Sequence, residues 1–249
     1  MQLFRRFRAP KPTFSAPLAP DEPFFAVGDL HGCDALLDRM ITRMGEIAPE
    51  IRRVFVGDYI DRGEASAQTL ARLRAYQQQD PDRVLCLRGN HEQMLERFLE
   101  APERHGPRWL RYGGLQTMAS YGLAPPPETA PPEKWTEARD RLAEAMGPGL
   151  LAWIADLPDW WQTGNVACLH AAADPARPIS EQELEHMLWG HPAFMSVPRS
   201  DGTWVLHGHT ITEDPRPEAG RIPVDTGAYA TGRLTAALVQ PGSVEFFSV

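Results

Sequence analysis

Five short apolar segments of the sequence are each followed by Asp, Asn or His side chains, often beside a glycine. Each segment has the length of a buried β-strand, and segments with helical spacing separate the first three. This alternation predicts an α/β domain, in which the carboxyl ends of strands gather a ligand site. The polar residues expected to meet there are Asp29 and His31; Asp58, Asp61 and Arg62; Asn90, His91 and Glu92; His170; and His207 and His209.

The rest of the chain suggests how this domain is organised. Helices are expected over 33–48 and 66–79, and a helical insertion over about 93–160. The last segments, 233–239 and 244–249, alternate around a Pro-Gly turn and predict a hairpin. The five strands are expected at 24–27, 54–56, 84–87, 166–169 and 204–206.

Composition excludes several classes of protein. A net charge of −8 argues against binding to a nucleic acid duplex, and no run reaches the ~18 apolar residues of a membrane span. Cys33, Cys86 and Cys168 are widely spaced and odd in number, which argues against disulfides. No secretory signal precedes residue 20, so a cytoplasmic protein is expected. Residues 1–22 are expected to be a basic, proline-rich flexible tail, and 23–249 a single domain.

The polar residues after the strands have the chemistry of a metal site. Carboxylate, amide and imidazole ligands without thiolate suit divalent manganese, iron or zinc ions. The donors exceed the need of one ion, so we expect two ions, about 3.5–4 Å apart, that activate a bridging water. Arg62 is expected to bind a phosphoryl group and His91 to act as general acid, with Asp61 holding its proton.

Three motifs resemble the signatures of PPP-type protein phosphatases in the calcineurin-like metallophosphoesterase superfamily. They are GDLHG at 28–32, GDYIDRG at 57–63 and GNHE at 89–92, and the resemblance covers about 23–249. It implies an α/β fold with a central β-sandwich flanked by helices. It also implies a dinuclear metal site at the carboxyl ends of the strands.

The resemblance assigns roles to the matching residues. The first ion would be bound by Asp29, His31 and Asp58, and the second by Asp58, Asn90, His170 and His209. Arg62 and Asn90 would contact phosphate, and His91 paired with Asp61 would be the acid. Relatives often carry a second phosphate-binding arginine where this chain has Gly190-His191. Either His191, or Arg199 nearby, therefore takes its place, or the phosphate group is held more weakly.

The leading functional hypothesis is a protein phosphatase with two ions, Mn²⁺ before Fe or Zn. It would hydrolyse phosphoserine and phosphothreonine, and also phosphotyrosine, in a protein or peptide by attack of the bridging water. The alternative is a dinucleoside polyphosphate hydrolase acting on diadenosine tetraphosphate. Such relatives usually read GNHD and lack Asp before Arg-Gly, so Asp61 and Glu92 favour the phosphatase. A non-catalytic scaffold is a minor alternative, because it predicts a lost ligand and all six are present.

Overall fold

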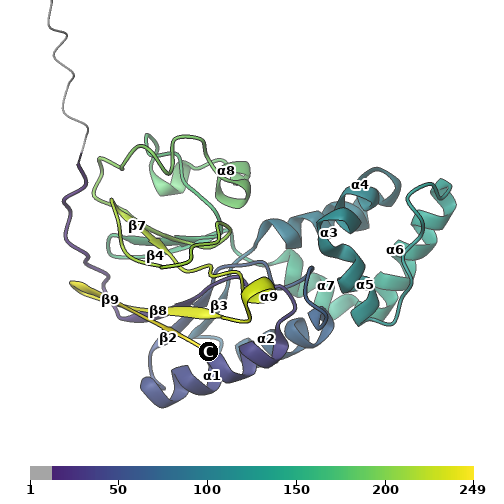
Figure 1. The fold of residues 1–249 in the computed structure, drawn as a ribbon, viewed down its shortest axis with the longest axis horizontal. Helices are drawn as coiled ribbons and strands as arrows, with labels where there is room; N and C mark the ends of the chain where they lie inside the picture. The colour runs from purple at the N-terminus through teal and green to yellow at the C-terminus, as the bar shows by residue number, and fades with distance from the viewer. Residues whose placement is uncertain (1–12) are drawn as a thin grey trace, which may run out of the picture.

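Nine strands lie among residues 13–249, the part of the chain that the computed structural model describes, and they form two sheets (Figure 1). The first sheet has the order β3-β2-β1-β8-β9: Val84–Cys86, Arg52–Phe55, Phe24–Val27, Thr235–Gln240 and Ser243–Ser248. The second has the order β4-β5-β6-β7: Trp160–Thr163, Val166–Leu169, Trp204–His207 and Arg221–Pro223. Strands β1, β2 and β3 are parallel, as are β5, β6 and β7. Each sheet therefore presents three carboxyl ends at one edge.

Alternating side chains along β1 explain why the two sheets stack. Phe24 and Ala26 are buried against the second sheet, whereas Phe25 and Val27 are buried against helices on the opposite face. The second sheet contributes to the shared core Val166, Cys168, Leu206, Ile222 and neighbouring Val224. The predicted sandwich with flanking helices is confirmed.

Helices cover the outer faces of both sheets. In Figure 1, α1 (Asp34–Ile47) and α2 (Ser66–Gln79) lie below the first sheet and α8 (Leu184–Trp189) lies above the second. Leu37, Met40 and Met44 form the buried stripe of α1. No helix among residues 13–249 is long and apolar enough to cross a membrane.

A group of helices gathers beside the sheets, on the right of Figure 1. It comprises α3 (Asn90–Glu100), α4 (Pro102–Trp109), the π-helical turn η1 (Leu110–Gly114), α5 (Leu115–Ser120), α6 (Pro132–Met146) and α7 (Pro148–Ala155). The remaining short helices are η2 (Ile179–Glu181) and α9 (Ala228–Thr231). One apolar cluster runs from Phe25 of β1 to Trp135 of α6, so these helices share a core with the first sheet.

The structure differs from the expected elements in two places. The helical insertion expected over about 93–160 is interrupted at Gly113, because its φ of 115° lies outside the helical region. Strands β4 and β7 were not predicted, since neither is a continuous apolar run. Both are edge strands of the second sheet, where one side of a strand needs no buried partner.

Residues 13–22 lie against the second sheet. The Phe14 ring packs on the edge of Trp204 at 4.9 Å, and Leu18 packs against the core between the sheets. Asn165 accepts a hydrogen bond from the Ala19 N–H at 2.8 Å. From Phe14 onward the chain therefore contacts the sheets, whereas a flexible tail was expected to residue 22. Residues 1–12 of that expected tail lie outside the described part, and the division at 22/23 stays a prediction.

The core between the sheets generates a stability prediction. Leu206→Ala should lower the free energy of unfolding by about 2–5 kcal/mol, because it leaves a cavity between two packed sheets. Leu184→Ala is the matched control, since Leu184 is 38% exposed at the start of α8. Urea unfolding followed by circular dichroism measures both. Similar losses for the two variants would contradict this account of the core.

Candidate active site

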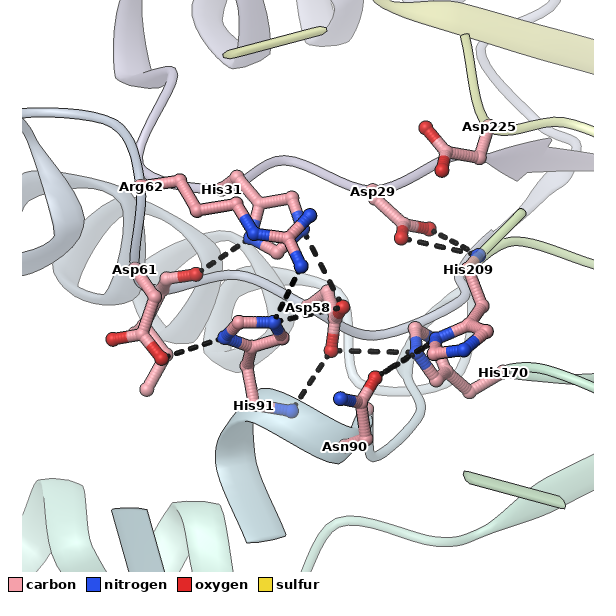
Figure 2. Close-up of polar contacts among 12 residues, drawn as sticks. Asp29, His31, Asp58, Asp61, Arg62, Asn90, His91, His170, His209 and Asp225 are labelled. Atoms are coloured by element: carbon pink, nitrogen blue, oxygen red, sulfur yellow. Dashed lines mark hydrogen bonds and ion pairs between the residues drawn. The ribbon is translucent and has the colours of Figure 1, made fainter. Parts of the chain in front are cut away.

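The polar residues that follow the strands meet at one edge of the sandwich (Figure 2). They come from the loops after β1, β2, β5 and β6 and from the first turn of α3, which follows β3. The structure brings together Asp29, His31, Asp58, Asp61, Arg62, Asn90, His91, His170 and His209. The convergence arises because parallel strands deliver their carboxyl ends to the same edge.

Asp58 occupies the centre of this cluster. Its Oδ1 accepts the backbone N–H of His91 at 3.0 Å and lies 3.4 Å from Nε2 of His170. Its Oδ2 lies 3.4 Å from Nε2 of His31. The two oxygens of one buried carboxylate thus face two different sets of imidazoles, which is the arrangement required of a bridging ligand.

Two histidines are oriented by backbone carbonyls. His31 Nδ1 donates to the Ile60 carbonyl at 2.8 Å, and His170 Nδ1 donates to the Val56 carbonyl at 2.9 Å. In the neutral imidazole this leaves the Nε2 lone pair directed into the cluster. Metal-binding histidines in proteins are commonly oriented by this kind of second hydrogen bond.

The spacing of the donor atoms fits a cation. His209 Nδ1 lies 3.2 Å from His170 Nε2 and 3.0 Å from Asn90 Oδ1. Donors about 2.0–2.2 Å from a shared ion are separated by about 3 Å, so these contacts match two ligands of one cation. Among residues 13–249, two groups of at least three His, Cys, Asp or Glu residues have donor atoms within 4.8 Å of one another: His31, Asp58 and His91; and Asp58, His170 and His209.

The charges of the cluster favour a bound cation as well. Burial, with the nearby Asp225 carboxylate, raises the pKa of Asp29 well above its usual value. Burial disfavours the charge of His170, but Asp58 outweighs it and raises the His170 pKa to about 10. The carboxylate of Asp29 therefore has too little positive charge around it. Divalent ions fit this set of donors, because they would supply the missing positive charge.

Asp29 makes a contact that the sequence did not indicate. Both of its carboxylate oxygens accept the backbone N–H of His209, at 3.2 and 3.1 Å. This contact joins the end of β1 in the first sheet to the loop after β6 in the second. The charge of Asp58 contributes to the raised pKa of Asp29, so the two carboxylates are near each other, and the assignment of Asp29 to the first ion stays a prediction.

Arg62, His91 and Asp61 form a hydrogen-bonded chain. His91 Nδ1 donates to Asp61 Oδ2 at 2.6 Å, and the Arg62 guanidinium donates to Nε2 of His91 at 3.1 Å and of His31 at 3.0 Å. Burial disfavours a charged His91, but Asp58 and Asp61 outweigh it and raise the His91 pKa. The imidazole is therefore suited to carry a proton at the edge of the cluster.

Two residues that hold Asp61 were missed by the sequence reasoning. Trp109 Nε1 donates to Asp61 Oδ2 at 2.9 Å, and the Thr117 hydroxyl donates to Oδ1 at 2.6 Å. Between them, the Gly113 carbonyl accepts the Arg62 N–H at 3.3 Å. A Cβ at Gly113 would lie 2.5 Å from the Arg62 nitrogen, so glycine is required there. The Gly113-Gly114 pair inside the expected helical insertion is the sequence feature that could have indicated this close approach.

Glu92 links the loop after β2 to the loop after β3 by hydrogen bonds. Its buried carboxylate accepts the N–H groups of Asp58 at 2.9 Å, Tyr59 at 2.8 Å and Gly89 at 2.9 Å. Burial, with the charge of Asp58, raises the Glu92 pKa to about 7. Glu92 therefore supports the loops that carry the candidate ligands and does not itself face the cluster.

The backbone of the site is strained. Among residues 13–249, six non-glycine residues have positive φ, and all but Ala219 belong to the cluster: His31, Asp58, Asp61, Arg62 and His209. Each such conformation costs on the order of 1–3 kcal/mol and persists only where surrounding contacts impose it. The hydrogen bonds made by Glu92 and Thr117 provide such contacts.

The expected second phosphate-binding residue does not join the cluster. The His191 ring packs on His186 at 4.5 Å and its Nδ1 accepts the Ala193 N–H. Within residues 13–249 no hydrogen bond or ion pair links it to the cluster, and its role stays a prediction. Arg199 is buried and bonded to Asp201 and to the carbonyls of Asp174 and Arg177, so it is a structural residue.

Comparison with known proteins identifies the relatives of this chain. A family model described as calcineurin-like phosphoesterase matches residues 22–213. A symmetrical bis(5'-nucleosyl)-tetraphosphatase from Janthinobacterium sp. (strain Marseille) is 38% identical over 255 residues, covering 85% of this chain and 91% of the relative.

Two solved structures share the fold at low sequence identity. A provisionally assigned diadenosine tetraphosphatase has a TM-score of 0.63 and 17% identity, covering 94% of this chain and 98% of that one. A serine/threonine phosphatase from Saccharomyces cerevisiae has a TM-score of 0.56 and 15% identity, covering 92% and 80%. At such identities the likeness concerns the fold alone.

The contacts of Glu92 generate a prediction. Glu92→Gln should lower the free energy of unfolding by about 1–3 kcal/mol, because an amide cannot accept all three backbone N–H groups and one buried donor is left unpaired. Glu96→Gln on the same helix is the matched control. It loses only a partly exposed ion pair with Arg88, for which about 1 kcal/mol or less is expected. Equal losses in thermal unfolding would contradict the role of Glu92.

Proposed function

The chain belongs to the calcineurin-like phosphoesterases, and we propose that it hydrolyses dinucleoside polyphosphates. The proposed reaction is symmetrical cleavage of a dinucleoside tetraphosphate, which leaves two phosphates on each nucleoside. The observation that carries this proposal is the 38% identity, over 85% of the chain, with the symmetrical tetraphosphatase. The cluster around Asp58 supports it with the donors and the cationic residue that phosphoester hydrolysis requires.

The expectation of a protein phosphatase with a phosphorylated protein or peptide as its substrate is wrong. The similarity to the tetraphosphatase overturns it. Asp61 and Glu92, which favoured the phosphatase, have structural reasons that do not depend on the substrate. Asp61 orients His91, and Glu92 binds the backbone of two loops. Neither side chain is therefore a reliable marker of what is hydrolysed.

The proposed ion ligands are those that the structure gathers around Asp58. They are Asp29, His31, Asp58, Asn90, His170 and His209, with Asp58 shared between two ions. Bound divalent ions, for which we propose Mn²⁺, would polarise the phosphoryl group and activate water. The carbonyls of Ile60 and Val56 keep His31 and His170 oriented for this purpose.

The remaining residues handle phosphate charge and the proton. Arg62 has two guanidinium nitrogens at the cluster edge and would bind the oxygens of the phosphoryl group under attack. In the structure Nε2 of His91 accepts from Arg62, so we propose that Arg62 turns to the phosphoryl oxygens when substrate binds and that Nε2 then takes up a proton. His91 would donate this proton to the leaving oxygen, while Asp61 holds Nδ1. The leaving group in this reaction is a nucleoside diphosphate. Because its terminal phosphate is acidic, with a pKa of about 6, it needs less help from an acid than a serine alkoxide does.

One prediction from the proposed function concerns substrate and products. With added Mn²⁺, the purified protein should convert diadenosine tetraphosphate into ADP alone, because symmetrical cleavage places two phosphates on each adenosine. Chromatography of the products measures this, with a phosphothreonine peptide assayed in parallel. Production of AMP and ATP would contradict symmetrical cleavage. Phosphate release from the peptide alone would overturn the proposed function.

Another prediction distinguishes two roles for His91, general acid and metal ligand. His91→Asn should lower kcat for diadenosine tetraphosphate by about 10²-fold, the lower end for general acids, because the leaving group is acidic. The variant should keep the metal content of the unaltered protein, whereas Asp58→Asn should lose metal. Elemental analysis of the purified proteins provides this readout. Equal loss of metal from both variants would make His91 a ligand.

A further inference from the structure

A groove of about 520 Å³ begins at Arg62 and runs between η1 and α9. Its walls include Arg111 and Tyr112 from η1, Leu115 from α5 and Tyr229 from α9. We call this surface the Tyr112 groove. A second hollow of about 430 Å³ shares Arg111 and Leu115 with it and is lined further by the prolines of 125–127. The Tyr112 groove thus leads from the cluster toward an apolar region.

The Tyr112 groove is joined directly to the reacting centre. The Tyr229 ring lies under the Arg62 guanidinium, with 5.0 Å from Cζ to the ring centroid, and packs edge-on against His31 at 5.2 Å. Gly113, in the same wall as Tyr112, bonds the backbone of Arg62. A substrate whose phosphoryl group is held by Arg62 would therefore extend naturally into this groove.

The groove combines aromatic surface with positive charge. Tyr112 and Leu115 are each 45% exposed and Tyr229 is 39% exposed, an unusual concentration of solvent-exposed apolar side chains. Arg111 projects at the same place, with a solvent-exposed ion pair to Glu128 as its only salt bridge among the described residues. Exposed aromatic rings stack on nucleobases, and guanidinium groups bind phosphates. This pairing matches a nucleotide better than a peptide.

We propose that the Tyr112 groove binds one nucleoside diphosphate half of the substrate. In this arrangement Arg62 holds the phosphoryl group at the cluster and Arg111 contacts phosphate oxygens of the same half. Tyr112 stacks on the base, beside Leu115. The proposal rests on the proposed function, because a substrate cut symmetrically carries a base on each side of the bond that breaks. It assigns recognition of the base to Tyr112 and Leu115, which are not among the candidate metal ligands.

Binding of ADP and substrate preference test the groove together. Tyr112→Ala should weaken ADP binding in calorimetry about tenfold, the scale of one lost base–aromatic stack. It should also lower the kcat/KM preference for diadenosine tetraphosphate over inorganic tetraphosphate about tenfold, since only the former carries bases. Tyr112→Phe keeps the ring and should restore both values. Met195→Ala, at a residue 60% exposed outside the groove, is the control.

The outcomes separate this inference from the proposed function. Cleavage of diadenosine tetraphosphate with equal ADP affinity in Tyr112→Ala and Met195→Ala would overturn the groove and leave the function standing. Absence of cleavage by the unaltered protein would overturn the function. In that case weaker ADP binding by Tyr112→Ala, restored in Tyr112→Phe, would still support a nucleotide site. Loss of affinity in Tyr112→Phe as large as in Tyr112→Ala would contradict stacking.

Discussion

The buried carboxylate of Asp58 is the constraint on which the rest of this structure depends. An ionised carboxylate is costly to bury unless charges and hydrogen bonds surround it. Burial would raise its pKa, but His170, His91 and His31 outweigh burial and hold the pKa well below its usual value. Those imidazoles come from both sheets and from α3, so stabilising one charge requires the whole sandwich to close.

Supporting contacts keep this centre in a strained shape. Asp58 and Asp61 both have positive φ, a backbone region that residues other than glycine adopt only rarely. Glu92 binds the backbone on one side of the loop that contains them, and Thr117 binds it on the other. The helices beside the sheets therefore belong to the site: they bring Trp109 and Thr117 to Asp61 and place Tyr112 next to Arg62.

The roles of these supporting residues explain why the sequence predicts the wrong substrate. Asp61 and Glu92 were used as markers of one branch of the family, but both act on the protein itself and none of their contacts is with a surface open to substrate. A centre of two ions would stabilise the attacking and leaving oxygens whichever group the phosphate carries. We propose instead that the choice of substrate rests on the surface around Arg62, which is formed by side chains from separate helices. Similarity of fold says little about the substrate, because proteins with one fold can have many functions.

The sequence by itself determined the α/β class, most strands and the set of polar residues that meet at one edge, and the resemblance of its motifs added the sandwich. It could do so because strand runs and the residues after them are local patterns, and parallel strands deliver their ends to one place. Only the tertiary structure decided that Trp109 and Thr117 hold Asp61, that Asp29 binds the His209 backbone and that Arg199 is structural. These contacts join residues far apart in the chain, in helices and loops whose packing follows from no local pattern. The Tyr112 groove has the same origin, since its two tyrosines lie in different helices.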